Sequence, residues 1–385
     1  MKDVNESGDT SDSFENISIE NLKYEKKVRE IKYFLLNTPA TRDAKYLDQL
    51  RSFALSEGGL VNDEIRKQVW PLLIDLQPEE FDEAPSPEEY ENHIEYSQVV
   101  LDVNRSIKRF PPGIPYESRV AMQDQLVRLI LRVIMKYPQL QYYQGYHDVA
   151  ITFLLVVGEN IAFHIMEKLS TNHLKHFMEP TMEKTSELLE YIFPLMNHVH
   201  PELCDYLERA EVGTMFCLPW FLTWYSHTLT KYEHVGRLYD YFLASEALIP
   251  LYLVPMVVIH RQDDVFATEC DMASLHQVLS QLPDELPFDD LLIKATQLYH
   301  KYPPGDIHKE VIAWKQKREK LLSVPRKPVK PVVQKPASRG WQFVQRVIPQ
   351  WFLPYGKIPF VLVSASFVVG LYAYYRYTNP VDGYD

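Results

Sequence analysis

The chain has 385 residues, with 40 Lys and Arg against 52 Asp and Glu and a formal net charge of −12. This acidic balance argues against a general nucleic-acid-binding protein, because contacts with phosphates need a basic face. The hydrophobic fraction of 46% is that of a chain with a core to bury. Only three cysteines occur, too few for a disulfide framework, so the sequence indicates a reducing compartment.

Residues 1–24 are predicted to form a disordered acidic tail. The first 20 residues hold six acidic side chains and one lysine, together with Ser, Asn and Thr and few apolar residues. Nothing in them resembles the apolar stretch of a secretory signal. This composition is typical of segments that bury too little apolar surface to fold.

The stretch 25–305 is predicted to be one irregular, multi-helix, all-α domain. Alternating apolar and polar strands with tight Asn-Gly or Asp-Gly turns are missing from the sequence, so no sheet is expected. Two apolar stretches, 149–158 and 247–259, are too short for a membrane span and are predicted to be buried core helices. Apolar residues recur at spacings near 3.6 in five further segments: 118–136, 183–196, 201–210, 232–244 and 271–282.

The chain after residue 305 divides into a basic part and an apolar part. Residues 306–357 are rich in Lys, Arg and Pro and are predicted to be an extended linker and juxtamembrane segment. Residues 358–375 carry no charge and are predicted to be a transmembrane tail anchor, although a buried C-terminal helix is an alternative. The positive-inside bias would place the domain in the cytosol and the short tail 376–385 in the lumen.

The first candidate functional residue lies in a helix predicted over residues 96–110. Val99 and Val103 lie on its apolar stripe, and Arg105 projects from nearly the opposite side. Asp102, one turn earlier, is placed to contact the guanidinium. A purely structural role is also open, because a basic residue in the last turn of a helix complements the helix dipole.

The second candidate lies in the loop Tyr142-Tyr143-Gln144-Gly145. This loop separates a helix that ends before Pro138 from an apolar helix that begins near Tyr146. Gly145 permits a tight turn and leaves Gln144 near a helix N-terminus, where anions are favoured. The simpler interpretation is two loop tyrosines and a surface amide without a special role.

Together with a third segment, these residues resemble the three motifs of the TBC-domain Rab GTPase-activating proteins, which are Arg-x-x-x-Trp, Ile-x-x-Asp-x-x-Arg and Tyr-x-Gln. The corresponding segments here are Arg66-Lys-Gln-Val-Trp70, Val99-Val-Leu-Asp102-Val-Asn-Arg105 and Tyr142-Tyr-Gln144. Later family segments are similar to Trp220-Phe-Leu-Thr-Trp224 and Arg237-Leu-Tyr-Asp240, so that the resemblance covers about residues 55–300. The chain departs from the pattern in having Val99 for the usual Ile and Tyr146-His147 for a more frequent Met-Asn.

The resemblance implies a helical TBC domain that stimulates GTP hydrolysis by a Rab in its GTP form. Arg105 would be an arginine finger and Gln144 would orient the attacking water. Asp102 would orient the arginine, and Tyr142 would fix the loop that carries the glutamine. Arg66 and Trp70 are expected to hold the domain together. GTP and Mg²⁺ would be bound by the partner, so no cofactor or metal of this chain's own is expected.

The C-terminal anchor and the Pro-Pro-Gly after the second motif resemble a member of this family at the endoplasmic reticulum. This implies a tail-anchored protein of the endoplasmic reticulum membrane whose catalytic domain faces the cytosol. Its partners would be Rabs of early secretory, endoplasmic reticulum-to-Golgi traffic.

Three other interpretations are open. One is a catalytically silent TBC-fold adaptor that binds a Rab at the membrane without activating it. Another is a thiolate phosphatase, although Arg209 follows Cys204 by five residues and that loop needs six. The third is a metal site, for which no His-Glu-x-x-His spacing occurs among the candidate ligands His173, His176, His198 and His200.

Overall fold

A computed structural model of the chain describes residues 9–37, 43–76, 84–106 and 114–323. Within these ranges every regular element is a helix, as predicted. The elements are α1 (Asp9–Leu36), α2 (Ala44–Leu55), α3 (Asp63–Leu73), α4 (Pro87–Glu91), α5 (Tyr96–Arg105), α6 (Tyr116–Lys136), α7 (Tyr146–Val157), α8 (Glu159–Thr171), the 3-10 helix η2 (Lys175–Met178), α9 (Glu183–Leu189), α10 (Ile192–Val199), α11 (Pro201–Arg209), the 3-10 helix η3 (Met215–Cys217), α12 (Leu218–Leu222), α13 (Tyr232–Ala244), α14 (Ile249–His260), α15 (Gln262–Ala267), α16 (Met272–Ser280), α17 (Phe288–Lys301) and α18 (Pro304–Ser323).

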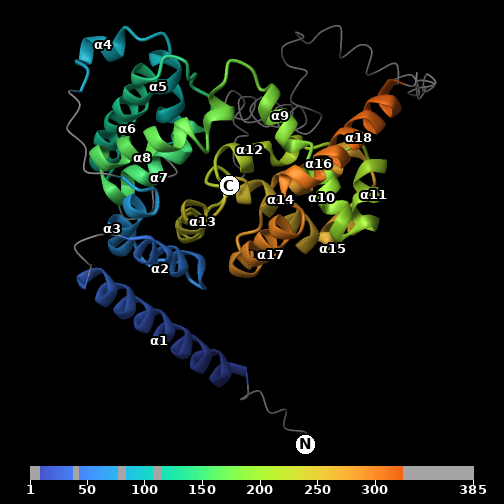
Figure 1. The fold of residues 1–385 in the computed structure, drawn as a ribbon, viewed down its shortest axis with the longest axis horizontal. Coiled ribbons are helices and arrows are strands. Elements are labelled where there is room, and N and C mark those ends of the chain that lie inside the picture. The colour runs from blue at the N-terminus through green and yellow to red at the C-terminus, as the bar shows by residue number, and fades with distance from the viewer. Residues whose placement is uncertain (1–8, 38–42, 77–83, 107–113, 324–385) are drawn as a thin grey trace, which may run out of the picture. The chain divides into compact units, whose positions relative to one another are not determined.

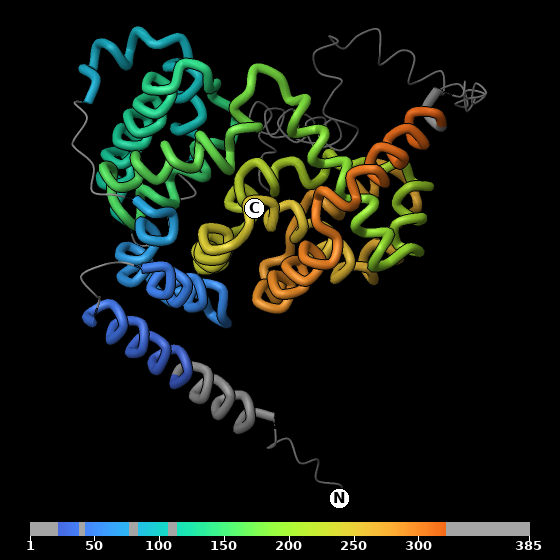
Figure 2. Tube along the Cα trace, in the orientation of Figure 1, coloured from blue at the N-terminus to red at the C-terminus, as the bar shows by residue number. Residues whose placement is uncertain are grey.

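The helices of the domain fall into two groups. In the first, α6 contacts α5, α7 and α8; in the second, α14 contacts α10, α12 and α17. Helix α3 contacts α7 and so belongs to the first group. Helix α13 joins the two groups, because it contacts α2 and α3 as well as α17 of the second group. Figures 1 and 2 show the first group at one end of the domain and the second group at the other, with α13 between them.

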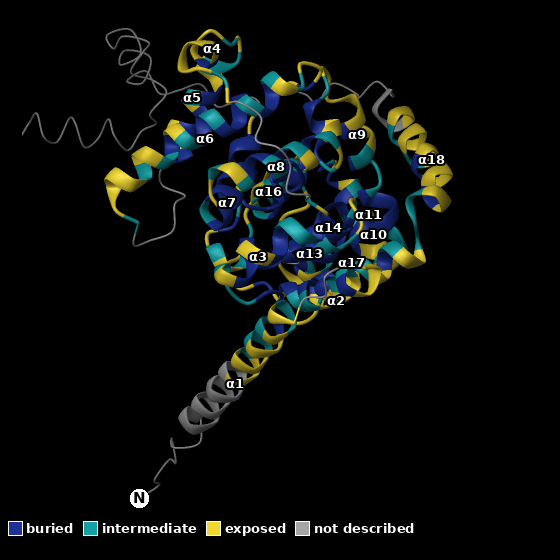
Figure 3. Ribbon diagram, turned by 60° about the vertical axis from the view of Figure 1, so that its left-hand side comes forward, coloured by how far each residue is buried: buried dark blue, intermediate teal, exposed yellow. Residues whose placement is uncertain are grey.

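Each group is built around a helix that is apolar on nearly every side. All residues of α7 except Leu155 are buried, and so are residues 249–258 of α14. A helix that is apolar all round must be surrounded by protein or lipid, and here neighbouring helices cover it. Figure 3 shows α7, α13 and α14 in dark blue inside the more exposed outer helices. The prediction of two buried core helices is therefore confirmed.

Asp240 of α13 fixes the first motif segment to the centre of the domain. Its fully buried carboxylate accepts hydrogen bonds from Arg66 Nε at 3.0 Å, Trp70 Nε1 at 2.8 Å and the Leu60 backbone N–H at 2.9 Å. Burial disfavours the charge on Arg66, but the Asp240 carboxylate outweighs it and raises the pKa of the guanidinium. Trp70 is fully buried. Both side chains thus serve the fold.

The helical body is longer than predicted at its N-terminal end. Helix α1 begins at Asp9 and therefore includes much of the stretch 1–24, for which a disordered tail was predicted. Nucleation is the costly step of helix formation, and further turns add at little cost. Because Ile31 of the same helix is fully buried, a nucleated helix can continue into polar sequence that would not fold alone.

The C-terminal boundary also differs from the prediction. Residues 306–323, predicted to begin an extended linker, belong to helix α18. The composition suggested an extended chain, but the first turns bury Ile307 and Val311 in the core. Arg318 then pairs with Glu190 at 2.9 Å, which attaches the basic half of the helix to the domain.

Three predicted features lie outside the described residues: the remainder of the linker up to residue 357, the tail anchor 358–375 and the tail 376–385. In the portion that is described, no helix combines the length and the apolarity that a membrane crossing requires. The end of the helix predicted over 96–110 is also outside, because α5 is described as far as Arg105 and residues 107–113 are not described.

Candidate functional site

Arg105 is the last residue of α5 and presents its guanidinium to solvent. The side chain is 64% exposed, and its Nη1 lies 3.7 Å from Oδ1 of the buried Asp102. Val99 and Val103 are fully buried on the other face of the helix. The apolar stripe therefore fixes the rotation of α5 and directs the arginine outward, as the helical spacing predicts.

The Asp102 carboxylate is held by two hydrogen bonds to a single oxygen. Gln98 Nε2 donates to Oδ2 at 3.0 Å, and the Tyr142 hydroxyl donates to the same atom at 3.1 Å. Oδ1 is the oxygen that faces Arg105. Burial, reinforced by the nearby Asp102 charge, raises the pKa of Tyr142, so its hydroxyl keeps the proton that it donates.

Gln144 lies two residues before the start of α7 at Tyr146 and is exposed. Within the described part of the chain, no hydrogen bond to its carboxamide is found. Gly145 follows with a φ of 109°, and a Cβ at this position would lie 2.8 Å from Thr223 Cγ2. A residue with a side chain would be strained and crowded here, so the glycine sets the direction in which the loop presents Gln144.

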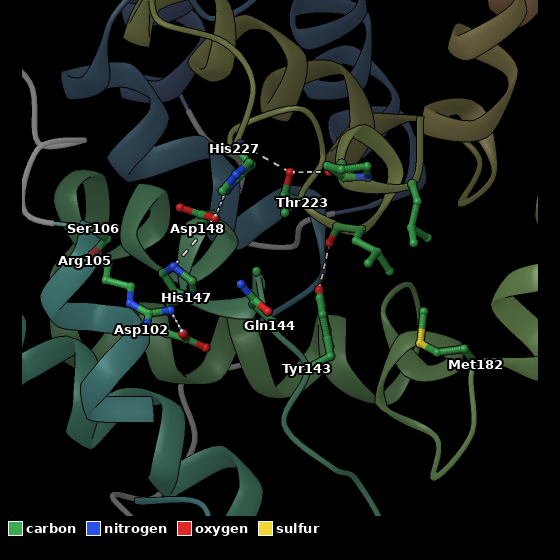
Figure 4. Close-up of a pocket in the computed structure, with 14 residues that line it drawn as sticks. Asp102, Arg105, Ser106, Tyr143, Gln144, His147, Asp148, Met182, Thr223 and His227 are labelled. Carbon is green, nitrogen blue, oxygen red and sulfur yellow. Dashed lines mark hydrogen bonds and ion pairs between the residues drawn. The ribbon is translucent and has the colours of Figure 1, made fainter. Parts of the chain in front are cut away.

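Arg105 and Gln144 line the same pocket, which has a volume of about 430 Å³ (Figure 4). One side of it is apolar, with Met182, Leu218, Pro219 and Leu222. The polar side chains that line it come from the end of α5 and its C-cap, from the loop before α7 and its first turn, and from the turn after α12: Asp102, Arg105, Ser106, Gln144, His147, Asp148, Thr223 and His227. Two groups that are distant in the sequence thus share one solvent-accessible site.

The pocket also contains a buried carboxylate and two histidines that the sequence did not single out. Asp148 is buried, with Oδ2 at 2.7 Å from His227 Nδ1 and 3.6 Å from His147 Nε2. A signal was available in the sequence, since an acidic residue in an otherwise apolar helix requires polar partners when it is buried. Which residues supply those partners depends on the tertiary fold, because His227 is 79 residues away.

The thiolate phosphatase interpretation does not fit the structure. Burial raises the pKa of Cys204 to about 12, and its thiol donates to the Phe193 carbonyl at 3.5 Å. A phosphatase nucleophile needs a lowered pKa and an anion-binding loop. Arg209 of the same helix is instead 62% exposed and pairs with Asp205 at 3.0 Å. Throughout the described ranges, no three or more His, Cys, Asp and Glu side chains are grouped so as to hold a metal ion.

Comparison with known proteins identifies the class. The model of the Rab-GTPase-TBC domain family matches residues 63–266, a segment that contains all three motifs. The chain therefore belongs to the TBC-domain family of Rab GTPase-activating proteins.

Individual relatives extend this match beyond the motifs. The chain is 45% identical over 296 residues to human TBC1 domain family member 20, covering 77% of this chain and 72% of the relative. Identity to the mouse protein of that name is 46% over 293 residues, covering 76% and 72%. The GTPase-activating protein gyp10 of Schizosaccharomyces pombe is 30% identical over 267 residues, covering 68% and 69%.

Solved structures show the same fold at low sequence identity. The Ypt/Rab-GAP domain of Gyp1p superposes with a TM-score of 0.57 at 16% identity, covering 72% of this chain and 99% of that one. The Chlamydomonas flagellar RabGAP TBC domain gives 0.54 at 14% identity, covering 77% and 96%. The predicted all-helical TBC fold is thereby confirmed.

Proposed function

We propose that this chain accelerates hydrolysis of GTP bound to a Rab-family GTPase by supplying Arg105 and Gln144 in trans. The observation that carries the proposal is that an exposed guanidinium and an exposed carboxamide, from two separate segments, line one pocket. Family membership supports the class of activity, and the relative gyp10 is itself described as a GTPase-activating protein.

The chemistry of phosphoryl transfer matches these two groups. Negative charge spreads over the phosphate oxygens in the transition state, and a planar guanidinium can bond two of them at once. An arginine finger of this kind accelerates hydrolysis by about 10³–10⁵-fold. The carboxamide of Gln144 has both donors and an acceptor, so it can hold an attacking water in line with the phosphate. In this proposal GTP and Mg²⁺ are bound by the partner GTPase.

Asp102 and Tyr142 have supporting roles in the proposal. The contact between Asp102 Oδ1 and Arg105 limits the directions open to the guanidinium. Tyr142 donates to Asp102 from the loop that carries Gln144, so the two finger segments are linked by a hydrogen bond. Because the rate of hydrolysis depends on how Arg105 and Gln144 are oriented, it should also depend on the hydrogen bond between Tyr142 and Asp102.

Single-turnover GTP hydrolysis by a panel of GTP-loaded Rabs tests the proposal. Arg105→Ala in the full-length chain should reduce stimulation by about 10³-fold or more, and Gln144→Ala should also remove most of it. Arg209→Ala is a matched control, because Arg209 is similarly exposed, at 62%, and also pairs with an aspartate of its own helix. Gln141→Ala is the control for the glutamine, since Gln141 is exposed in the same loop.

Stimulation that survives either finger substitution would rule out the two-finger mechanism. Rab binding without any stimulation by the wild-type chain would instead identify a catalytically silent adaptor. The same panel would also identify the preferred Rab.

We also propose that residues 358–375 tether the chain to the endoplasmic reticulum membrane, where it acts on Rabs of early secretory traffic. The support is the uncharged composition of this segment and the basic stretch that precedes it. A tether would raise the effective concentration of the chain near membrane-bound Rabs. Truncation before Ile358 should move the protein from the washed membrane pellet to the supernatant. Retention in the pellet would contradict the anchor.

A further inference from the structure

A chain of polar contacts runs from the turn between α12 and α13 to α5. His227 Nδ1 donates to Asp148 Oδ2 at 2.7 Å, and His147 Nε2 lies 3.6 Å from the same oxygen. On its other side, His147 Nδ1 lies 3.0 Å from the Tyr142 hydroxyl, which donates to Asp102 Oδ2 at 3.1 Å. Figure 4 shows Asp148 between the two histidine rings and Asp102 beside Arg105.

The direction of the hydrogen bonds follows from the single proton of Tyr142. Its hydroxyl donates that proton to Asp102, so its oxygen can only accept from His147. His147 therefore carries a proton on Nδ1. Its Nε2 faces the Asp148 carboxylate, which can only accept, so the 3.6 Å contact is attractive when Nε2 is protonated as well and the ring is positively charged. The orientation in which the His147 ring donates to Tyr142 is also the one that places its Nε2 next to the Asp148 carboxylate.

Asp148 has its carboxylate inside the domain, with only 1% of the side chain exposed. A buried carboxylate is stable only where hydrogen bonds or charges compensate it. His227 supplies the short hydrogen bond, at 2.7 Å, whereas the contact with His147 is longer, at 3.6 Å. Removal of His227 would therefore take away the shorter of these two contacts.

The turn that carries His227 is held in an uncommon backbone conformation. Trp224 and Tyr225 have φ values of 48° and 68°, in the left-handed region that bulky residues rarely adopt. Both side chains are buried, and the Tyr225 hydroxyl donates to the Pro250 carbonyl at 3.0 Å. Buried packing thus fixes the turn, and with it the approach of His227 to Asp148.

We propose that His227 is a positioning residue for GTPase activation: by holding Asp148 it fixes His147 and Tyr142, and through them the Asp102 carboxylate that orients Arg105. This inference rests on the proposed function. His227 touches none of the reacting atoms in it and acts through the hydrogen bond from its Nδ1. Loss of that bond should lower the maximal rate of stimulated hydrolysis without weakening the docking of the partner.

Three substitutions separate positioning from direct contact with the partner. His227→Ala removes the ring. His227→Asn keeps an N–H donor near the position of Nδ1, whereas His227→Gln places its amide near the position of Nε2. His198→Ala is the control, because His198 pairs with an exposed Glu310 at 2.7 Å and does not line the pocket.

The measurement is single-turnover GTP hydrolysis by a Rab that the full-length wild-type chain stimulates, over a range of activator concentrations. His227→Ala and His227→Gln should lower the plateau rate by about tenfold, with the half-saturating concentration within about twofold of wild type. His227→Asn should recover the rate to within about threefold, and His198→Ala should equal wild type. Melting temperatures of all variants report whether each is folded.

Several outcomes would overturn the inference. One is an unchanged plateau rate for His227→Ala. Another is recovery by His227→Gln but not by His227→Asn, which would indicate a partner contact through Nε2. A rise in the half-saturating concentration at an unchanged plateau would assign His227 to docking. Two other results would contradict the proposed function itself. One is an Arg105→Ala variant that stimulates hydrolysis as well as wild type, and the other is a wild-type chain that stimulates no Rab.

Discussion

Trp70 Nε1 donates a hydrogen bond to Asp240 Oδ1 at 2.8 Å, across 170 residues of sequence. The same carboxylate binds Arg66 through two guanidinium nitrogens, so it joins α3 to α13. A Cβ at Gly59 would lie 2.5 Å from Asp240 Oδ2, which shows how closely the chain before α3 approaches. The first motif is therefore an anchor for the fold, at a distance in sequence from the residues that line the pocket.

Asp240→Ala should destabilise the domain strongly. It leaves the Arg66 guanidinium, which is only 7% exposed, without its main partner. Breaking a buried pair in this way costs about 3–5 kcal/mol. Urea unfolding measures the change, and Asp290→Ala is the control because Asp290 is 55% exposed and pairs with Lys294. Equal unfolding free energies for the two variants would contradict the anchoring role of Asp240.

Gly145→Ala should reduce both stability and stimulation of GTP hydrolysis. The new methyl group would meet Thr223 Cγ2 at 2.8 Å, and the backbone would keep an unfavourable φ of 109°. The strain costs about 1–3 kcal/mol, and a displaced Gln144 should lower the rate by about tenfold or more. Gly305→Ala is the control, since nothing lies within 4 Å of its Cβ position. A fully active Gly145→Ala variant would show that the conformation of this turn does not determine the position of Gln144.

Lys27 should make stability depend on alkaline pH. Burial, reinforced by the charge of Arg237, lowers its pKa from 10.5 to about 8, while its Nζ donates to the Glu57 carbonyl at 2.6 Å. Between these two values the unfolded chain binds more protons than the folded one, so the free energy of unfolding rises with pH. Below about pH 8 both states are protonated, and the lysine's unfavourable contribution is constant.

The difference in unfolding free energy between wild type and Lys27→Met isolates this effect from other titrating groups. Measured by urea unfolding at pH 7 and at pH 10, it should shift in favour of wild type at the higher pH. Lys294→Met serves as control, because Lys294 is 52% exposed and pairs with Asp290 on the surface. The same difference at both pH values would mean that Lys27 titrates normally.

Cys270 should be the one cysteine of the three that reacts quickly with a thiol reagent in the native protein. It is exposed, whereas Cys204 and Cys217 are buried. Burial also raises the pKa of both buried thiols, to about 12 for Cys204, which lowers the amount of reactive thiolate. Ellman's reagent at pH 8 should count a single fast thiol, and Cys270→Ser should remove it. A second fast thiol would indicate that one of the buried segments opens.

Local periodicity predicted the regular helices well. The segments 118–136 and 232–244 agree closely with α6, Tyr116–Lys136, and α13, Tyr232–Ala244. The segment 183–196 was predicted as one helix, but the structure has a break before Ile192. Pro194 gives the reason, because its missing N–H is tolerated in the first turn of a helix and not in the interior.

The sequence predicted the candidate site only where the position of a residue on one helix face determines the direction of its side chain. The stripe around Val99 predicts correctly that Asp102 lies beside an outward-facing Arg105. That Arg105 and Gln144 line one pocket was expected only from the resemblance to known motifs, since spacing within one helix carries no information about another segment. Neither helical spacing nor the motif resemblance predicted the contact between Asp148 and His227, because this contact depends on the strained turn after α12.

The Arg105 side chain is 64% exposed, and in the proposed function this exposure determines whether it stabilises dissolved GTP or GTP bound to a partner. An ion pair at 4 Å in bulk water is worth about 1 kcal/mol, and about 4 kcal/mol near a protein surface where water is partly excluded. Dissolved GTP would therefore gain little from this hydrated guanidinium. A nucleotide delivered inside another protein, whose docking displaces the water, would gain much more. In the proposed function, this exposure means that Arg105 would bind free GTP weakly and act on GTP that a docked partner presents.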